Sequence, residues 1–358
     1  MASTIESDRP VPSAPARPAR VRVGQASRRR RMVGLVVLVV LVVGAAIASL
    51  AFGTKSIPVG DVVTAYLDRE ATNTNHLIVR DLREPRTLLG LVVGAGLGGA
   101  GALMQGVTRN PLADPGLLGV NAGASFAVVV GIWLFDVTET LGQVWFALAG
   151  AAVASVVVYV LGTSGRSGAT PVRLALAGAA LGALLFAFTR TIILTDQGAL
   201  DEFRFWAVGS LAGRDPALSG QVAPFIVVGV LIAIAAARQL NALALGDDAA
   251  LALGTRLGLT RGVSVVGIML LCGAAVAAAG PIAFVGLVVP HAARAWFGPD
   301  QRWLIPTSVL LGIALILICD TAGRLVARPA EIQVGIMTAV LGGPVFIFLV
   351  RRTRMAQL

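Results

Sequence analysis

Long runs of hydrophobic residues, separated by short polar segments, follow one another along most of the chain. The first run covers Val33–Phe52 and nine more follow it. A bilayer core is about 30 Å thick, so a helix needs about 20 apolar residues to cross it. The pattern predicts an all-α, polytopic membrane protein with about ten transmembrane helices, the later ones near residues 87–107, 117–135, 142–162, 172–195, 219–238, 262–280, 281–297, 304–323 and 334–350.

Two of these spans, 262–280 and 281–297, form one continuous apolar run. As a single helix the run would be about 54 Å long at 1.5 Å per residue, much longer than the bilayer is thick. Gly280-Pro281 lies in its middle, and a proline ends or kinks a helix. The sequence therefore predicts two short helices joined by a tight turn.

Composition supports a lipid environment. The chain is 56% hydrophobic and 13% charged, whereas a soluble domain has about 25% charged residues. The net charge is +10, but the basic residues lie in chain ends and loops and not in a stripe with aromatics, which disfavours nucleic-acid binding. Cys272 and Cys319 lie in apolar runs, and His76 and His291 are far apart, so we expect buried cysteines and no metal site.

The chain begins with a segment unlike the rest. Residues 1–31 are rich in Pro, Ala, Ser and Arg and end in Arg28–Arg31, directly before the first span. We expect a disordered basic tail in the cytoplasm, followed by one transmembrane domain over residues 32–358. With the tail inside, ten spans place both termini in the cytoplasm and most of the 29 Lys and Arg residues on that side.

A glycine-rich stretch matches a nucleotide-binding pattern by chance. Gly94–Gly99 fits G-x-G-x-x-G, but that fingerprint requires a strand before the glycines, and here they lie inside a predicted span. Small residues recur every fourth position, which favours close helix packing in lipid; they are Gly90, Gly94, Gly98 and Ala102. There is no Walker A motif in the sequence, so ATP-driven transport would require another chain to bind ATP.

Two polar segments interrupt the apolar runs. Arg109–Gly116 is sufficiently explained as a polar turn capped by prolines. Leu240–Gly254 is amphipathic and flanked by Arg238, Arg256 and Arg261. It is either an interfacial helix with arginines reaching the headgroups or a docking element for a cytoplasmic partner.

The order of motifs from about Arg83 to the C-terminus resembles the FecCD-type permeases of ABC importers for iron–siderophore complexes, haem or cobalamin. The chain departs from the family pattern at Glu84, at Ile332-Gln333 and at Asp215-Pro216. The residues that carry the resemblance are Gln105, Arg109, Asn110, Pro111, Gly280, Pro281, Pro290, His291 and Asp320.

This resemblance implies a transport subunit that performs no covalent chemistry and binds no cofactor of its own. Its expected partners are a second permease subunit, identical or related, two cytoplasmic ATP-binding subunits that hold ATP and Mg²⁺, and an extracytoplasmic substrate-binding protein. The expected location is the plasma (inner) membrane of a bacterium. The solute would pass along the interface between the two permeases.

The resemblance also assigns roles to residues. The segment at about 240–258 is expected to form two short helices, joined near Gly246, that couple the permease to the ATPase. Its coupling residues would be Asn241, Leu243, Leu245, Gly246, Ala250, Leu251 and Gly254. At the outer surface, Arg83, Arg86 and Arg324 are expected to receive acidic residues of the binding protein, because a guanidinium holds a carboxylate with two hydrogen bonds.

Other functions stay open at this stage. Ferric siderophores are the expected cargo, with cobalamin and haem as alternatives. An ion-coupled secondary carrier would place ionisable residues inside its spans, and here Arg190 is the main one. A membrane scaffold without transport activity is the third possibility, which the docking motifs disfavour.

Overall fold

The computed structural model describes residues 28–164 and 171–355, which form helices and no strand. The predicted disordered tail lies mostly outside the described residues. Its last four residues, Arg28–Arg31, were expected to be disordered, and this is wrong because they form the first turn of helix α1. Arginine has a high helix propensity, so the transmembrane helix extends one turn beyond its apolar run.

Sixteen helical elements follow one another along the described residues. Their bounds are α1 Arg28–Ala51, α2 Val59–Leu67, α3 Thr74–Leu77, the π-helix η1 Ile78–Arg83, α4 Glu84–Thr108, the 3₁₀ helix η2 Pro115–Leu118, α5 Val120–Phe135, α6 Thr140–Thr163, α7 Pro171–Thr195, α8 Gln197–Ala207, α9 Leu218–Leu243, α10 Asp247–Ala252, α11 Leu257–Ala279, α12 Val285–Phe297, α13 Gln301–Val326 and α14 Val334–Met355.

The all-α, polytopic prediction is confirmed. Among the described residues, 7 helices are long and apolar enough to cross a membrane: α1, the continuous helix Thr74–Thr108, α6, α7, α9, α11 and α13. Helix α5 and the segment Val334–Phe348 of α14 are shorter apolar helices. The second span is longer than predicted, because α3, η1 and α4 join without a break.

The break at Gly280-Pro281 is confirmed, but the span predicted after it is not. Gly280 has a φ of +76° and ends α11, and the chain becomes helical again only at Val285. Helix α12 then has 13 residues and is about 20 Å long. It is too short to cross a bilayer core, so the prediction of a full span over 281–297 is wrong.

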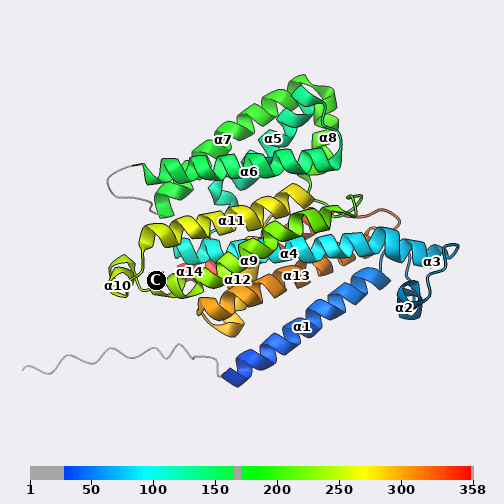
Figure 1. Ribbon diagram of the computed structural model, residues 1–358, viewed down its shortest axis with the longest axis horizontal. Coiled ribbons are helices and arrows are strands. Elements are labelled where there is room, and N and C mark those ends of the chain that lie inside the picture. Colours follow the sequence, from blue (N-terminus) through cyan, green and yellow to red (C-terminus); the bar gives the residue numbers. More distant parts are fainter. Residues whose placement is uncertain (1–27, 165–170, 356–358) are drawn as a thin grey trace, which may run out of the picture.

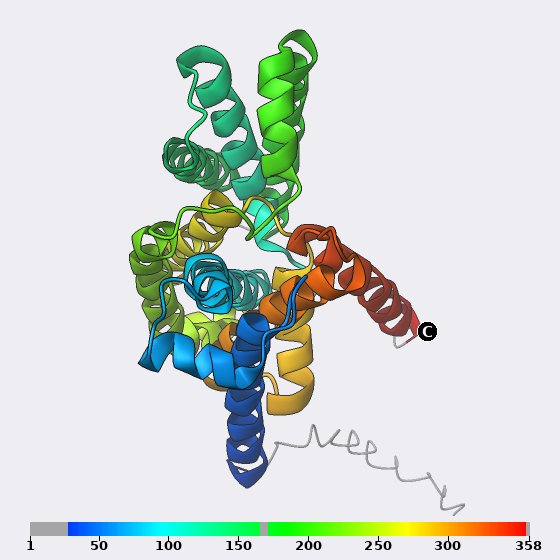
Figure 2. The ribbon, with the colours of Figure 1, turned by 90° about the vertical axis from the view of Figure 1, so that its right-hand side faces the viewer.

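Helix α4 forms the centre of the molecule. Figure 2 looks along the long helices and shows α4 surrounded by others, and it packs on α9, α11, α12 and α13. The prediction of close packing through its glycines is confirmed. A Cβ atom added at Gly94 would lie 2.6 Å from Cα of Ile313 in α13, closer than real Cβ atoms come. These glycines therefore let the two backbones touch.

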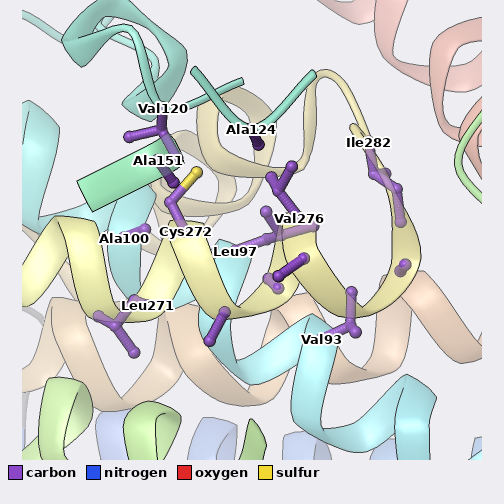
Figure 3. Packing of buried hydrophobic residues seen from close by; sticks show 14 of the residues in the cluster. Val93, Leu97, Ala100, Val120, Ala124, Ala151, Leu271, Cys272, Val276 and Ile282 are labelled. Carbon is purple, nitrogen blue, oxygen red and sulfur yellow. The ribbon is translucent and has the colours of Figure 1, made fainter. Parts of the chain in front are cut away.

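Helices α5 to α8 form a second group along the upper side of Figure 1. This group meets the central one where α11 packs on α5 and α6. Figure 3 shows that contact, with Cys272 of α11 beside Ala151 of α6 and near Ala124 of α5. Both cysteines are buried and free, as expected.

The long helices give the molecule two ends (Figure 1). One end carries α2, α3 and α8, and we call it the α2 end. The other carries α10 and the end of α14, and we call it the α10 end. Helix α1 begins at the α10 end, because Arg31 stacks on Trp303 at the start of α13. The described chain therefore begins and ends at the same end of the molecule.

Candidate functional site

A buried group of charges joins three segments at the α2 end. Arg86 of α4 grips Asp320 of α13, with Nη2–Oδ1 and Nε–Oδ2 distances of 2.9 and 3.0 Å. Nη2 of Arg324, one turn further along α13, lies 3.1 Å from Oδ2 of Asp320. Glu331, in the loop after α13, accepts from Nη1 of Arg86 at 2.6 Å. We call these four residues the α2-end cluster.

Burial makes the α2-end cluster rigid. The side chains of Asp320, Arg324 and Arg86 are 1, 2 and 11% exposed. Arg324 also donates to the carbonyl and the hydroxyl of Ser49 in α1, at 3.1 and 3.0 Å. Each buried cation thus has several acceptors, which offsets its loss of water. The cluster fastens α1, α4 and α13 together.

The structure changes the picture of the three arginines expected to dock a binding protein. Arg83 is buried and donates to the carbonyls of Leu50 and Lys55, and Arg324 is buried too. Arg86 is already held by Asp320. The three guanidiniums are therefore already satisfied within the chain, by α1, by α13 and by the loops that follow these helices. Glu84 pairs with Arg80 at 2.9 Å, and among the described residues it forms no ion pair with any of the three. The docking role itself stays a prediction.

A cavity of about 350 Å³ opens above the α2-end cluster. Several charged side chains line it, most of them basic. Arg214, from the loop before α9, is one that sequence reasoning missed, and its Nε donates to the Ser210 carbonyl at 3.3 Å. The charged lining residues are Lys55, Asp81, Arg83, Arg86, Arg214, Arg324 and Glu331.

A second ionic group lies at the α10 end. Asp247, the first residue of α10, lies 3.1 Å from Arg109 and 2.9 Å from Arg261. Arg109 ends α4 with a φ of +52°, a conformation that non-glycine residues rarely adopt. Arg261 belongs to the first turns of α11. This α10-end cluster links α10 to two membrane helices, and its carboxylate is 41% exposed.

The predicted coupling segment is built differently from expectation. It contains one short helix, α10, and its other part is the end of α9, which runs on to Leu243. The turn between them lies at Gly246, with a φ of +106°. That turn is where it was expected, but the prediction of two separate short helices is wrong.

Few of the residues assigned to coupling are available to a partner. Leu245 and Leu251 are 68 and 55% exposed, whereas Leu243 and Ala250 are buried. Leu243 is therefore not a free anchor. Leu253 is exposed and was missed, since an apolar residue in a membrane protein gives no signal of its own. Gly254 has positive φ and ends the segment.

Asn241 has a structural part in the same region. Its Nδ2 donates to Asp300 at 2.7 Å, and its Oδ1 accepts the Gln301 N–H at 2.8 Å. Since Asp300 also caps α13, Asn241 fastens the end of α9 to the start of α13. Its side chain is thus held within the chain, while Gly246 and the exposed leucines remain free.

Other family-motif residues fasten helices together. Gln105 of α4 donates to the Leu287 carbonyl and accepts from Arg294, each at 3.1 Å. It thereby holds the short helix α12, which contains Pro290 and His291, against α4. At the turn that begins with Gly280-Pro281, the Ser210 N–H donates to the Ala279 carbonyl at 2.7 Å.

The loop after α4 is a turn held by its own side-chain hydrogen bonds and not an open site. Asn110 Oδ1 accepts the Leu112 N–H at 2.9 Å across Pro111. Asp114 caps η2 by accepting the Gly116 N–H at 2.8 Å. Burial raises the pKa of Asp114, and this hydrogen bond lowers it in part. The polar turn predicted for 109–116 fits these contacts.

Arg190 lies on the wall of a cavity of about 530 Å³ between α5, α7 and α8. Polar side chains share that wall, among them Asn121, Ser125 and Thr189. The guanidinium stacks over Phe186, 5.0 Å from the ring centroid and one turn deeper in α7. It therefore points along the cavity and not toward the end of its helix.

Taken together, the long apolar helices, the ionic groups at both ends and the cavity that holds Arg190 define a multi-pass membrane permease. The sequence model of the FecCD transport family matches residues 38–352. The chain belongs to this family.

Its relatives include transport permeases of two bacteria. The chain is 47% identical to the ferric enterobactin transport system permease protein FepD of Escherichia coli (strain K12), over 86% of this chain and 92% of that one. It is 39% identical to the probable siderophore transport system permease protein YfiZ of Bacillus subtilis (strain 168), with the same coverage. Among solved structures, an inward-facing metal-chelate type ABC transporter matches with a TM-score of 0.78 and 27% identity, over 90% of this chain and 99% of that one.

Proposed function

We propose that this chain is the permease subunit of an ATP-driven importer that carries ferric siderophores across a bacterial inner membrane. The observation that carries the proposal is the 47% identity with a ferric enterobactin permease over 86% of the chain. The α10 end would lie in the cytoplasm and the α2 end outside. The basic first turn of α1, Arg28–Arg31, belongs to the α10 end and agrees with the positive-inside rule.

The α10 segment is the part that suits an ATPase partner. It exposes Leu245, Leu251 and Leu253 at one end of the molecule, and a short helix with apolar residues docks well in a groove. The α10-end cluster would pass its movement on, since Asp247 is bonded to both α4 and α11. The ATPase would hold ATP and Mg²⁺, and this chain would hold neither.

The cavity above the α2-end cluster is the part that suits a substrate-binding protein. Its lining is mostly basic, and a complementary acidic surface would gain orientation and association rate from it. Glu331 is the exposed member of the cluster, at 34%. A carboxylate of the binding protein would compete with Glu331 for Arg86.

A second permease subunit, identical or related, would cover the exposed apolar faces of α7 and α14. Helix α14 projects from the central group in Figure 2 and packs mainly on α12 and α13. Both helices expose large apolar side chains, including Leu176, Leu184, Val340 and Ile347. If the two subunits paired there, the cavity that Arg190 lines would lie beside their interface, along which the solute would pass.

Reconstitution tests the proposed function. The chain, its ATPase and its binding protein would be placed in lipid vesicles and supplied with iron-labelled catecholate, hydroxamate and citrate chelates, haem or cobalamin. We expect ATP-dependent uptake of a ferric chelate and no ATP hydrolysis by the isolated chain. Uptake driven by an ion gradient without ATP would instead identify a secondary carrier. Uptake of haem or cobalamin alone would keep the importer and replace its cargo.

A further inference from the structure

A groove lies between α9 and α11 at the α10 end. Its volume is about 530 Å³. Arg238 and Ala242, one turn apart on α9, line one wall. Leu259 and Val263, one turn apart on α11, line the other, and Arg256 lies at its edge. Each wall is thus one helix face, and the groove runs along the two helices.

The two arginines of this groove have no carboxylate partner in the described part of the chain. Arg238 and Arg256 are both exposed and take part in none of its ion pairs. Their neighbours Arg109 and Arg261 share Asp247 instead. Two unneutralised guanidiniums therefore border one groove and favour an anion there.

The groove continues into a surface that faces lipid. Leu231 and Ile234 on α9 are exposed, as are Val263 and Val266 on α11. Exposed apolar side chains on membrane-spanning helices contact acyl chains. Arg238 follows Ile234 by one helical turn, so the guanidinium lies where the apolar face ends. A molecule with a long apolar part and an anionic head fits here, with the apolar part along the lipid-facing residues and the head at the two arginines.

We propose that the groove binds an anionic phospholipid, with its phosphate between Arg238 and Arg256 and an acyl chain along Leu259 and Val263. The planar fork of arginine suits phosphate oxygens, and basic pockets between helix ends hold anionic headgroups. Leu253, Gly254 and Thr255 line the same groove, so the bound lipid would also brace the segment after α10. The proposal goes beyond the proposed function, because it requires only that the chain lies in a membrane.

Lipid retention measures this site directly. The purified chain would be extracted from vesicles of equal parts phosphatidylcholine and phosphatidylglycerol, and the retained lipids counted by native mass spectrometry. We expect phosphatidylglycerol to be retained about tenfold over phosphatidylcholine, and this preference to vanish in the Arg238→Gln/Arg256→Gln variant. The control Arg69→Gln/Arg204→Gln removes the same charge at the α2 end and should keep the preference. If the groove variant and the control variant retained phosphatidylglycerol over phosphatidylcholine to the same degree, the proposal would be overturned.

Three further measurements separate the lipid from other occupants. Val263→Trp fills the groove without removing charge and should also abolish retention, and an unchanged preference in this variant would count against the site. Glycerol phosphate added in millimolar excess should not displace the lipid, and displacement would show a free-phosphate site instead. Normal lipid retention in the double arginine variant, with loss of ATPase binding, would show that the arginines serve a protein partner.

Discussion

The two ends of the molecule use the same chemical unit, one aspartate between two arginines, in opposite surroundings. At the α2 end, Asp320 is 1% exposed and joins Arg86 and Arg324. At the α10 end, Asp247 is 41% exposed and joins Arg109 and Arg261. A buried ionic group cannot open without leaving charge uncompensated, whereas a solvated one exchanges its bonds for water at little cost. The first unit suits a fixed joint, and the second suits a joint that moves.

The helices that the two clusters join also differ, since one cluster joins tightly packed helices and the other joins a loosely packed one. The α2-end cluster binds α4 to α13, whose backbones already touch at Gly94, and also to α1 through Ser49. The α10-end cluster connects two long helices to a helix of 6 residues that packs only lightly on α9 and α11. Movement at α10 would therefore be transmitted through ionic bonds that can reform.

Asp320→Ala is expected to have the largest effect. It leaves Arg86 and Arg324 buried without their shared carboxylate, and breaking a buried ion pair in this way costs about 3–5 kcal/mol. The melting temperature and the yield of folded protein in detergent would measure the loss.

The matched control for Asp320→Ala is Asp81→Ala at the same end. Asp81 pairs with Arg69 at 3.4 Å, and both side chains are about half exposed, so its removal should change stability by less than about 1 kcal/mol. Similar losses in the two variants would mean that burial does not distinguish the clusters.

Asp247→Asn is expected to act on coupling more than on stability. The amide keeps the shape but loses the charge that holds Arg109 and Arg261. The pair with Arg109, whose side chain is 34% exposed, contributes less than about 1 kcal/mol. Arg261 is 10% exposed, so its pair adds to the loss, which should still stay below that of Asp320→Ala. We expect transport in the reconstituted importer to fall about fivefold or more while ATP hydrolysis continues. Asp247→Glu should restore most of it. Parallel loss of transport and folded protein would show that Asp247 is only structural.

Sequence patterns predicted the helices and the close packing well, because both depend on local composition. Apolar length predicted the spans, and the four-residue spacing of Gly90, Gly94 and Gly98 predicted close helix packing, for which the structure supplies α13 as the partner. The short α12 was missed, because hydropathy does not show where the helix resumes after Gly280-Pro281. Helicity returns only at Val285.

The candidate sites were predicted less well, since they depend on long-range contacts. Arg86 and Asp320 are 234 residues apart, and no local signal reveals that one holds the other. The arginine positions suggested a docking surface, but Arg83 donates to the backbone carbonyls of Leu50 and Lys55, and Arg324, besides its side-chain acceptors, donates to that of Ser49. Such acceptors have no sequence signature, because every residue supplies a carbonyl.

Glu331→Gln is expected to have a smaller effect at the α2 end. Glu331 is the exposed partner of Arg86, and its removal frees one edge of the guanidinium while Asp320 keeps the other. If the binding protein supplies a competing carboxylate, its affinity should rise about two- to fivefold, corresponding to about 0.4–1 kcal/mol. Titration in lipid nanodiscs at low salt would measure this. Weaker binding would mean that Glu331 itself faces a basic partner residue.

Salt is expected to produce the smallest difference, and it compares the two ends through one conservative variant at each. The Debye length shortens from about 10 Å at 0.1 M to about 3 Å at 1 M ionic strength, so exposed pairs are screened and buried ones much less. The stability difference between the native chain and Asp247→Asn should therefore shrink as salt rises. The difference for Asp320→Asn should stay constant, because Asp320 is shielded from solvent on every side. Melting curves of the three proteins over this range provide the measurement. Equal salt dependence of both differences would show that solvent reaches Asp320, and the α2-end cluster would then be a movable joint as well.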